Sequence, residues 1–312
     1  MYWILNSQSI GFGARQNELI ELSLTYKFAG FDIDINEFHS QAQAQGMDYA
    51  KRFIASAPVT LGAFDLPVRW QDEVVEFKID LSNLDAVCQT AVSIGARTCV
   101  TTVLPYSEQR PYHESFELAR ERLGEIGDVL HKHGIRLGVK FLGAAHHREG
   151  KSESFITKPD ELVTLVKTVS NPAVGLCLDA WDWHVAGGTL DQIKEIDPNH
   201  IVVVQVADLP EGADLATVAE DQRLLPGATG VVPVTGLIEY LKAKDYKGAV
   251  VPYCHPSQFP SRNKNTTVSS IRTAIERTIN PPPPVEEPSE SDTAADAAAD
   301  SKDTPTEAIA TS

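Results

Sequence analysis

Short apolar runs alternate with amphipathic stretches along most of this chain. The apolar runs are short and bounded by polar or glycine-containing segments, which is typical of buried strands rather than helices. The expected strands are Ser9–Phe12, Gly30–Ile35, Val59–Asp65, Thr98–Leu104, Arg136–Leu142, Val174–Asp179, Ile201–Val206 and Ala249–Tyr253. Strands that alternate with helices in this way indicate a parallel sheet covered by helices.

The amphipathic stretches between these runs carry apolar residues at helical spacing. The helices expected from this spacing are Leu81–Ile94, Tyr112–His133, Asp160–Val169 and Val234–Ala243. The third of them follows Lys158-Pro159, and proline at an early helical position is a start signal.

Eight strand-and-helix units before residue 280 predict a single (β/α)8 TIM barrel over residues 1–280. An open, doubly wound sheet is the competing architecture. Its dinucleotide-binding form carries a G-x-G-x-x-G motif after an early strand, whereas Gly11-Phe12-Gly13 lacks the third glycine. The pattern therefore favours the barrel.

Composition changes sharply after residue 280. Residues 281–312 begin with four prolines and continue with small and acidic residues but no aromatic residue, which predicts a disordered acidic tail. The whole chain has a net charge of −16. An acidic protein of this kind is a poor partner for nucleic acid or for an anionic membrane surface, so neither is expected.

The cysteines and the N-terminus indicate a cytoplasmic protein. Four scattered cysteines form no C-x-x-C pair, so neither a zinc knuckle nor a disulfide framework is expected. The run Met1–Asn6 is too short for a signal peptide. No apolar run approaches the roughly 18 residues needed to cross a bilayer.

Three expected strands each place one polar residue near their C-terminal end, where TIM barrels carry their chemistry. These residues are Lys140, Asp179 and Gln205. Asp179 ends an otherwise apolar run, and a buried carboxylate needs a partner, so we assign it to the site. Lys140 has two interpretations: an electrophile or Schiff-base amine, or a structural cation paired with Asp179. Gln205 either faces substrate or binds neighbouring strand-end groups.

The order of five motifs resembles the sugar phosphate isomerase/epimerase family, the xylose isomerase-like TIM barrels, over about residues 8–275. The motifs are Gly134–Lys140, Val174–Asp179, Gln205 with Asp208, Arg223 with Pro226-Gly227, and Ala249–Tyr253. The resemblance implies a barrel that acts on a sugar or polyol at its C-terminal mouth.

The same resemblance implies one divalent metal, such as Mn²⁺, held by two glutamates, an aspartate and a histidine or glutamine. Such a hard cation polarises a substrate carbonyl or hydroxyl. Here Lys140 and Pro252 stand at the two glutamate positions, while Asp179 and Gln205 remain. We therefore expect the usual metal site to be lost, with no resident cofactor.

Further candidates come from the loops that follow these strands. Arg223 and His147 would suit an anionic sugar, although His147 also fits an exposed loop. Trp181 either stacks on a sugar face or packs against a helix. His184 follows Asp179 closely and is the third catalytic candidate with Lys140 and Asp179, although a loop histidine is often simply exposed.

Three functions remain open at this point. The first is an isomerase or epimerase that recruits Asp179, Gln205, His184 and Arg223. The second is a metal-free lyase or aldolase-like enzyme that uses Lys140 as a Schiff-base amine. The third is a non-catalytic sugar-binding protein. A small sugar or polyol is the expected partner in each case, and a homodimer is one of the assemblies open to such a barrel.

Overall fold

A parallel sheet forms the centre of the computed structural model, which describes residues 1–8, 11, 13–52, 54–259 and 263–280. Nine strands of the described residues run in the order β3-β2-β1-β11-β10-β9-β7-β5-β4. They are β1 Tyr2–Leu5, β2 Gly30–Phe31, β3 Thr60–Leu61, β4 Ala63–Asp65, β5 Thr98–Val103, β7 Arg136–Phe141, β9 Val174–Asp179, β10 Ile201–Val206 and β11 Ala249–Pro252.

The two ends of this order meet, so the sheet closes on itself. Strands β3 and β4 are separated only by Gly62, and they pair with β2 and β5 respectively. A Cβ atom at Gly62 would lie 2.1 Å from Asp32 Oδ1 and 2.6 Å from Ile4 Cγ2, so this junction requires glycine. Counting β3 and β4 as one interrupted strand gives eight barrel positions, which confirms the (β/α)8 barrel.

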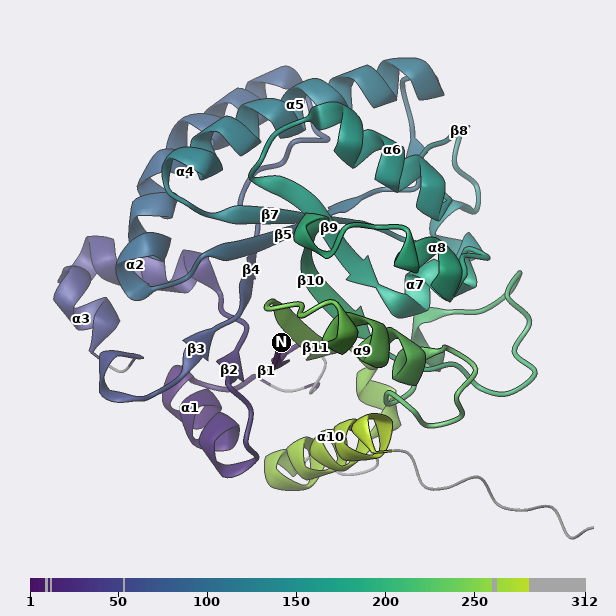
Figure 1. Cartoon of the computed structure of the whole chain (residues 1–312). Coiled ribbons are helices and arrows are strands. Elements are labelled where there is room, and N and C mark those ends of the chain that lie inside the picture. Colours follow the sequence, from purple (N-terminus) through teal and green to yellow (C-terminus); the bar gives the residue numbers. More distant parts are fainter. Residues whose placement is uncertain (9–10, 12, 53, 260–262, 281–312) are drawn as a thin grey trace, which may run out of the picture. The chain divides into compact units, whose positions relative to one another are not determined.

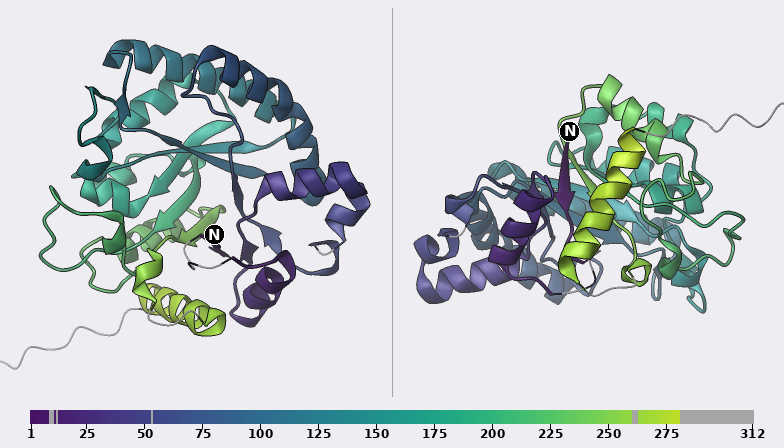
Figure 2. Two further views of the ribbon diagram at one scale, coloured as in Figure 1. Left: turned by 180° about the vertical axis from the view of Figure 1, so that it is seen from behind. Right: turned by 90° about the horizontal axis from the view of Figure 1, so that it is seen from below.

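Helices surround the barrel, as the views in Figure 1 and Figure 2 show. They are α1 Gln16–Thr25, α2 Ile35–Gln45, α3 Met47–Lys51, α4 Val74–Ile94, α5 Tyr112–Lys132, α6 Pro159–Val169, α7 Ala180–Val185, α8 Leu190–Lys194, α9 Val234–Ala243 and α10 Lys264–Ile279. All four helices expected from the sequence are confirmed, and α4 begins seven residues earlier than expected.

The first and last of these helices lie side by side (Figure 1, Figure 2). An ion pair of 2.9 Å joins Lys264 Nζ of α10 to Glu18 Oε2 of α1. Helix α10 buries Val268, Ile271 and Ile275 in the same apolar core as Leu5 of β1. The N-terminal and C-terminal parts of the barrel are thereby joined by helices as well as by strands.

Short elements line the loops. Five 3₁₀ helices are η1 Ile54–Ser56, η2 Ala145–Arg148, η3 Pro198–His200, η4 Glu220–Gln222 and η5 Pro256–Gln258, all within the described residues. An antiparallel pair joins β6 Tyr106–Ser107 to β8 Glu153–Ser154. Of these, η2 and η4 lie near the site described below.

One strand prediction needs correction. The first barrel strand is Tyr2–Leu5, which pairs with β2 and β11 and buries Ile4 and Leu5. The expected strand Ser9–Phe12 falls largely on residues 9, 10 and 12, which lie outside the described residues, as do residues 281–312 of the expected tail. The short run at the N-terminus is a strand because partners on both sides satisfy its backbone, which a search for long apolar runs does not detect.

Two further expectations bear on the described residues. All four cysteines are buried and free. No helix among the described residues is both long and apolar enough to span a bilayer.

Candidate active site at the barrel mouth

A cavity of about 670 Å³ opens where the strands end. Its lining includes polar side chains at or just after strand ends on opposite sides of the barrel, namely Asn6, Asp32, Asp65, Lys140 and Gln205, together with Arg223 from the loop after β10. Parallel strands bring their C-terminal ends to one face, which explains why residues far apart in sequence meet here. Asp32 and Asp65 lie on one side of the cavity, and Lys140 and Arg223 lie on the other side, where Glu220 contacts Arg223.

Lys140 is the principal cation that projects from a strand. It is the penultimate residue of β7 and is 9 % exposed. Its Nζ donates a hydrogen bond of 2.9 Å to Gln205 Oε1, lies 3.8 Å from Asp179 Oδ2 and stands 4.5 Å from the ring centroid of Tyr253. Burial lowers the pKa of Lys140, but the Asp179 carboxylate together with Tyr253 and Cys177 outweighs this, and the net pKa lies above its usual value. The side chain is therefore an ammonium ion.

Asp179 has stronger partners than Lys140. Arg223 Nη1 donates to both of its oxygens, at 3.1 Å to Oδ1 and 2.9 Å to Oδ2. Oδ1 also accepts the backbone N–H groups of Trp181 and Asp182, because Asp179 is both the last residue of β9 and the N-cap of α7. Both carboxylate oxygens are thus engaged inside the protein.

Arg223 is the centre of a buried ion network. Its guanidinium is 2 % exposed and also contacts Asp182 Oδ2 at 2.6 Å and Glu220 Oε2 at 2.5 Å. Burial and the Asp179 charge raise the pKa of Asp182, while Arg223 opposes that rise. The positive charge of Arg223 is therefore balanced by three carboxyl groups.

Asp32 is the most perturbed carboxyl group on the other side of the cavity. Asn6 Nδ2 donates to its Oδ2 at 2.8 Å, and the Ala63 N–H donates to its Oδ1 at 2.7 Å. Burial raises the pKa of Asp32 to about 7 against these hydrogen bonds, and the nearby Asp65 charge adds to the rise. A carboxyl group with such a pKa exchanges protons near neutral pH.

Sequence reasoning missed Asp32 and Asp65, although a signal was present. Asp65 ends the expected strand Val59–Asp65, as Asp179 ends its own, and Asp32 is a polar residue within the expected strand Gly30–Ile35. The five motifs that resemble the family all lie after residue 133, so they indicate no residue in the first half of the barrel.

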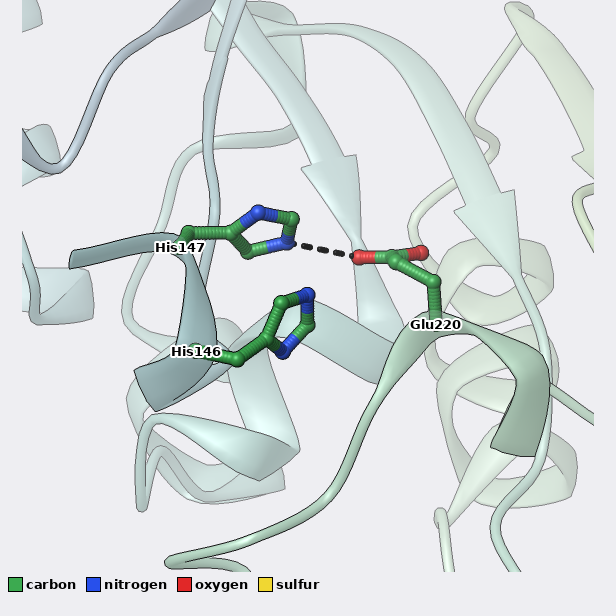
Figure 3. Close-up of side chains that lie close together, drawn as sticks. All are labelled: His146, His147 and Glu220. Carbon is green, nitrogen blue, oxygen red and sulfur yellow. Dashed lines mark hydrogen bonds and ion pairs between the residues drawn. The ribbon is translucent and has the colours of Figure 1, made fainter. Parts of the chain in front are cut away.

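The rim of the cavity carries two histidines and a glutamate. His147 of η2 lines the cavity and places Nε2 3.0 Å from Oε1 of Glu220, and His146 lies beside it with a ring-centroid separation of 3.9 Å (Figure 3). Burial alone would raise the pKa of Glu220, but His147 and Arg223 lower it to about 2. Glu220 is therefore an ionised carboxylate.

The remaining predicted residues lie elsewhere. Trp181 is fully buried, and the centroid of its ring lies 4.1 Å from Cζ of Arg223. It therefore packs against the ion network and does not face the cavity. His184 lines a separate small cavity with Trp183 and Leu190. Pro252 ends β11 and pairs with Val206. Lys140, Gln205, Arg223 and His147 are thus brought together, with Asp179 behind them.

Comparison with known proteins gives consistent results. The family model described as xylose isomerase-like TIM barrel matches residues 11–274. An inosose isomerase of Bacillus licheniformis is 25 % identical over 201 residues, which cover 64 % of this chain and 67 % of that protein. A xylose isomerase domain protein of Alicyclobacillus acidocaldarius superposes with a TM-score of 0.78 at 21 % identity, covering 89 % of this chain and 98 % of that one. A D-psicose 3-epimerase gives 0.66 at 12 % identity, covering 88 % and 97 %.

Proposed function

Because the chain belongs to the family of xylose isomerase-like TIM barrels, we propose that it is an isomerase of a small sugar or keto-polyol bound at the barrel mouth. The inosose isomerase relative supports a polyhydroxylated carbonyl compound as the substrate class. The observation that carries the proposal is the pairing of a fixed ammonium with a carboxyl group of near-neutral pKa around one cavity.

The strand-end positions do not fit a divalent metal, so the mechanism uses none there. The amide oxygen of Gln205 already accepts a hydrogen bond from Lys140, and both oxygens of Asp179 accept hydrogen bonds from Arg223. A dication placed among these groups would meet two fixed positive charges and find no unengaged carboxylate.

Lys140 replaces the metal as the electrophile in this proposal. An ammonium ion that donates to a substrate carbonyl oxygen stabilises the negative charge that develops when the neighbouring carbon loses a proton. Gln205, Asp179 and the Tyr253 ring hold Lys140 in place, so the charge is already oriented before substrate binds.

Asp32 transfers the proton. Its carboxylate removes a proton from the carbon beside the carbonyl, and the electron pair passes to the carbonyl oxygen to give an enediolate. The resulting carboxylic acid then returns the proton to the former carbonyl carbon. The proton of the adjacent hydroxyl group moves to the former carbonyl oxygen, so that the carbonyl and the hydroxyl group exchange places and the isomerisation is complete. A pKa of about 7 suits a group that must both accept and donate a proton near neutral pH.

The Schiff-base alternative is less well supported. A nucleophilic lysine must be a neutral amine, and its pKa is usually lowered for that purpose. The Asp179 carboxylate instead raises the pKa of Lys140 despite its burial. Borohydride treatment in the presence of ketoses and aldoses should therefore leave Lys140 unmodified.

Solvent proton exchange tests the proposal. A panel of ketoses, aldoses and inososes would be incubated with the protein in D₂O and excess chelator, and loss of the proton signal beside the carbonyl followed by NMR. We expect exchange with at least one compound, reduced about 100-fold or more in Asp32→Asn and Lys140→Met. Glu211→Gln, at an exposed loop residue, should exchange at the wild-type rate.

Two results would contradict this function. Exchange that survives Asp32→Asn would remove Asp32 from the reaction. Absence of exchange throughout, with thermal stabilisation by a panel compound, would instead indicate a sugar-binding protein without turnover.

A further inference from the structure

Three potential metal ligands converge at the rim of the barrel mouth. His146 and His147 belong to η2, which follows β7, and Glu220 begins η4 in the loop after β10. One nitrogen of each histidine and one carboxylate oxygen lie within 4.8 Å of one another (Figure 3). Two imidazoles and one carboxylate form a ligand set that Zn²⁺ takes in proteins.

The backbone orients His146 as a ligand. Its Nδ1 lies 3.2 Å from the carbonyl oxygen of Val218, an acceptor, so Nδ1 carries the ring proton. The lone pair is then on Nε2, which points toward His147 and Glu220 (Figure 3). Metal-binding histidines commonly donate their other N–H to a backbone carbonyl in this way.

Glu220 is oriented by the buried network. Arg223 Nε holds Oε2 at 2.5 Å, and Arg223 is itself fixed by Asp179 and Asp182. The other oxygen, Oε1, is directed at His147 Nε2 at 3.0 Å. Because three carboxyl groups balance Arg223, its charge does not leave an excess positive charge next to this rim.

We propose that His146 Nε2, His147 Nε2 and Glu220 Oε1 bind one Zn²⁺ ion. Ligand atoms about 2 Å from a tetrahedral metal stand about 3.3 Å apart, so the His147–Glu220 pair opens slightly and His146 moves inward. The ion replaces the hydrogen bond between His147 and Glu220, and the His147 ring proton moves from Nε2 to Nδ1. His147 and Glu220 line the main cavity, so a water or a substrate oxygen supplies the fourth ligand.

This rim site is separate from the strand-end position formed by Lys140, Asp179, Gln205 and Pro252. It does not depend on the proton transfer proposed for Asp32 and Lys140, because metal binding can be measured without any substrate. The proton-exchange assay contains chelator, so the two proposals succeed or fail independently.

Zinc titration of the full chain tests the site. Protein stripped with chelator and then freed of it would be titrated with ZnCl₂ by calorimetry. We expect one Zn²⁺ per chain at micromolar or tighter affinity, weakened at least about tenfold in both His146→Ala and His147→Ala. His113→Ala, at a histidine whose side chain is 80 % exposed on α5, should bind like the wild type.

Co²⁺ binding to the wild-type protein is a second test that needs no variant, so its result does not depend on whether a variant folds. Co²⁺ in the wild-type protein should give the intense visible bands of a four-coordinate site and two paramagnetically shifted imidazole N–H signals. No binding, or spectra without imidazole signals, would overturn the proposal.

A metal at the strand ends would also overturn it. In that case both histidine variants would bind zinc like the wild type, while Lys140→Glu would strengthen binding.

Discussion

Asp32 and Lys140 line the same cavity, but different surroundings determine their pKa values. Burial dominates at Asp32, where two neutral hydrogen-bond donors only partly stabilise the carboxylate. At Lys140 burial is outweighed only by the combined effect of Asp179, Tyr253 and Cys177. Near pH 7 Asp32 is therefore present partly as a carboxylate while Lys140 is an ammonium ion, and a base paired with an electrophile is the combination that enolisation of a carbonyl compound requires.

The state of Asp32 predicts how stability depends on pH. The folded chain keeps this proton up to about pH 7, whereas an unfolded chain releases it near pH 4. Because the folded state binds more protons between these values, the free energy of unfolding falls as pH rises through that window. Asp32→Asn keeps an acceptor for the Ala63 N–H. Its stability relative to the wild type should rise by about 2–3 kcal/mol from pH 5 to pH 8.

Urea unfolding of both proteins at several pH values measures this difference. Asp48→Asn, at an exposed residue of α3, provides the matched control and should follow the wild-type pH dependence. Parallel curves for Asp32→Asn and the wild type would show that Asp32 titrates as an ordinary carboxyl group.

At the level of elements, the site depends on how each strand passes into the next loop. Asp179 is both the last residue of β9 and the N-cap of α7. Asp182 of α7 accepts a hydrogen bond of 2.8 Å from the Gly143 N–H through its Oδ1. A Cβ atom at Gly143 would lie 2.2 Å from the Asp182 carbonyl oxygen. The loop after β7 therefore lies directly against α7.

Two glycines test this packing, one with no room for a Cβ atom and one with open space. Gly143→Ala should destabilise the protein by about 1–3 kcal/mol, because the added methyl group pushes apart the β7 loop and α7. Gly124 lies within α5 with open space at its Cβ position. Gly124→Ala should stabilise by about 0.5–1 kcal/mol through helix propensity. Urea unfolding gives both values, and equal effects would disprove the close contact.

The sequence predicted the interior strands well for a physical reason. Parallel strands covered by helices are buried on both faces and therefore appear as continuous apolar runs, as β7, β9 and β10 do. Strand β1 has only four residues, too few to stand out. Its role depends on partners that lie far away in sequence.

The site was predictable where it lies on strands and less so where it lies on helices. Lys140 and Gln205 project into the cavity because strand position fixes their direction. Trp181 and His184 lie on α7, where successive side chains point about 100° apart, so the way the helix packs decides which side chain faces the mouth. The same holds for Asp182, which lies on α7 and contacts Arg223.

For the whole molecule, the described strands and helices form one compact unit, Met1–Asn280. Its closure joins the two ends of the unit, since β1 pairs with β11 and α1 lies beside α10. Stability of the barrel should therefore be sensitive to loss of α10.

Two shortened chains test where the folded unit ends. We expect a chain that ends at Asn280 to keep the thermal midpoint of the full protein. A chain that ends at Asn263 lacks α10 and uncovers the core against which Val268, Ile271 and Ile275 pack. Each such side chain contributes about 1.5–3 kcal/mol, so this chain should melt at a much lower temperature or fail to fold. A lowered midpoint for the longer of the two would place the boundary beyond Asn280.

The pairing of β1 with β11 also means that β1 must wait during synthesis until β11 has been made. The Met1 ammonium donates to the Tyr246 carbonyl oxygen across 245 residues, and Tyr2 pairs with Ala249 just beyond. At about 5–20 residues per second a ribosome needs roughly ten seconds to a minute to cover that stretch. During this interval β1 is made but lacks one neighbour, and its open edge is available to another nascent chain on the same polysome. Slower translation lengthens this exposure, so the yield of soluble protein should depend on codon choice between the two strands.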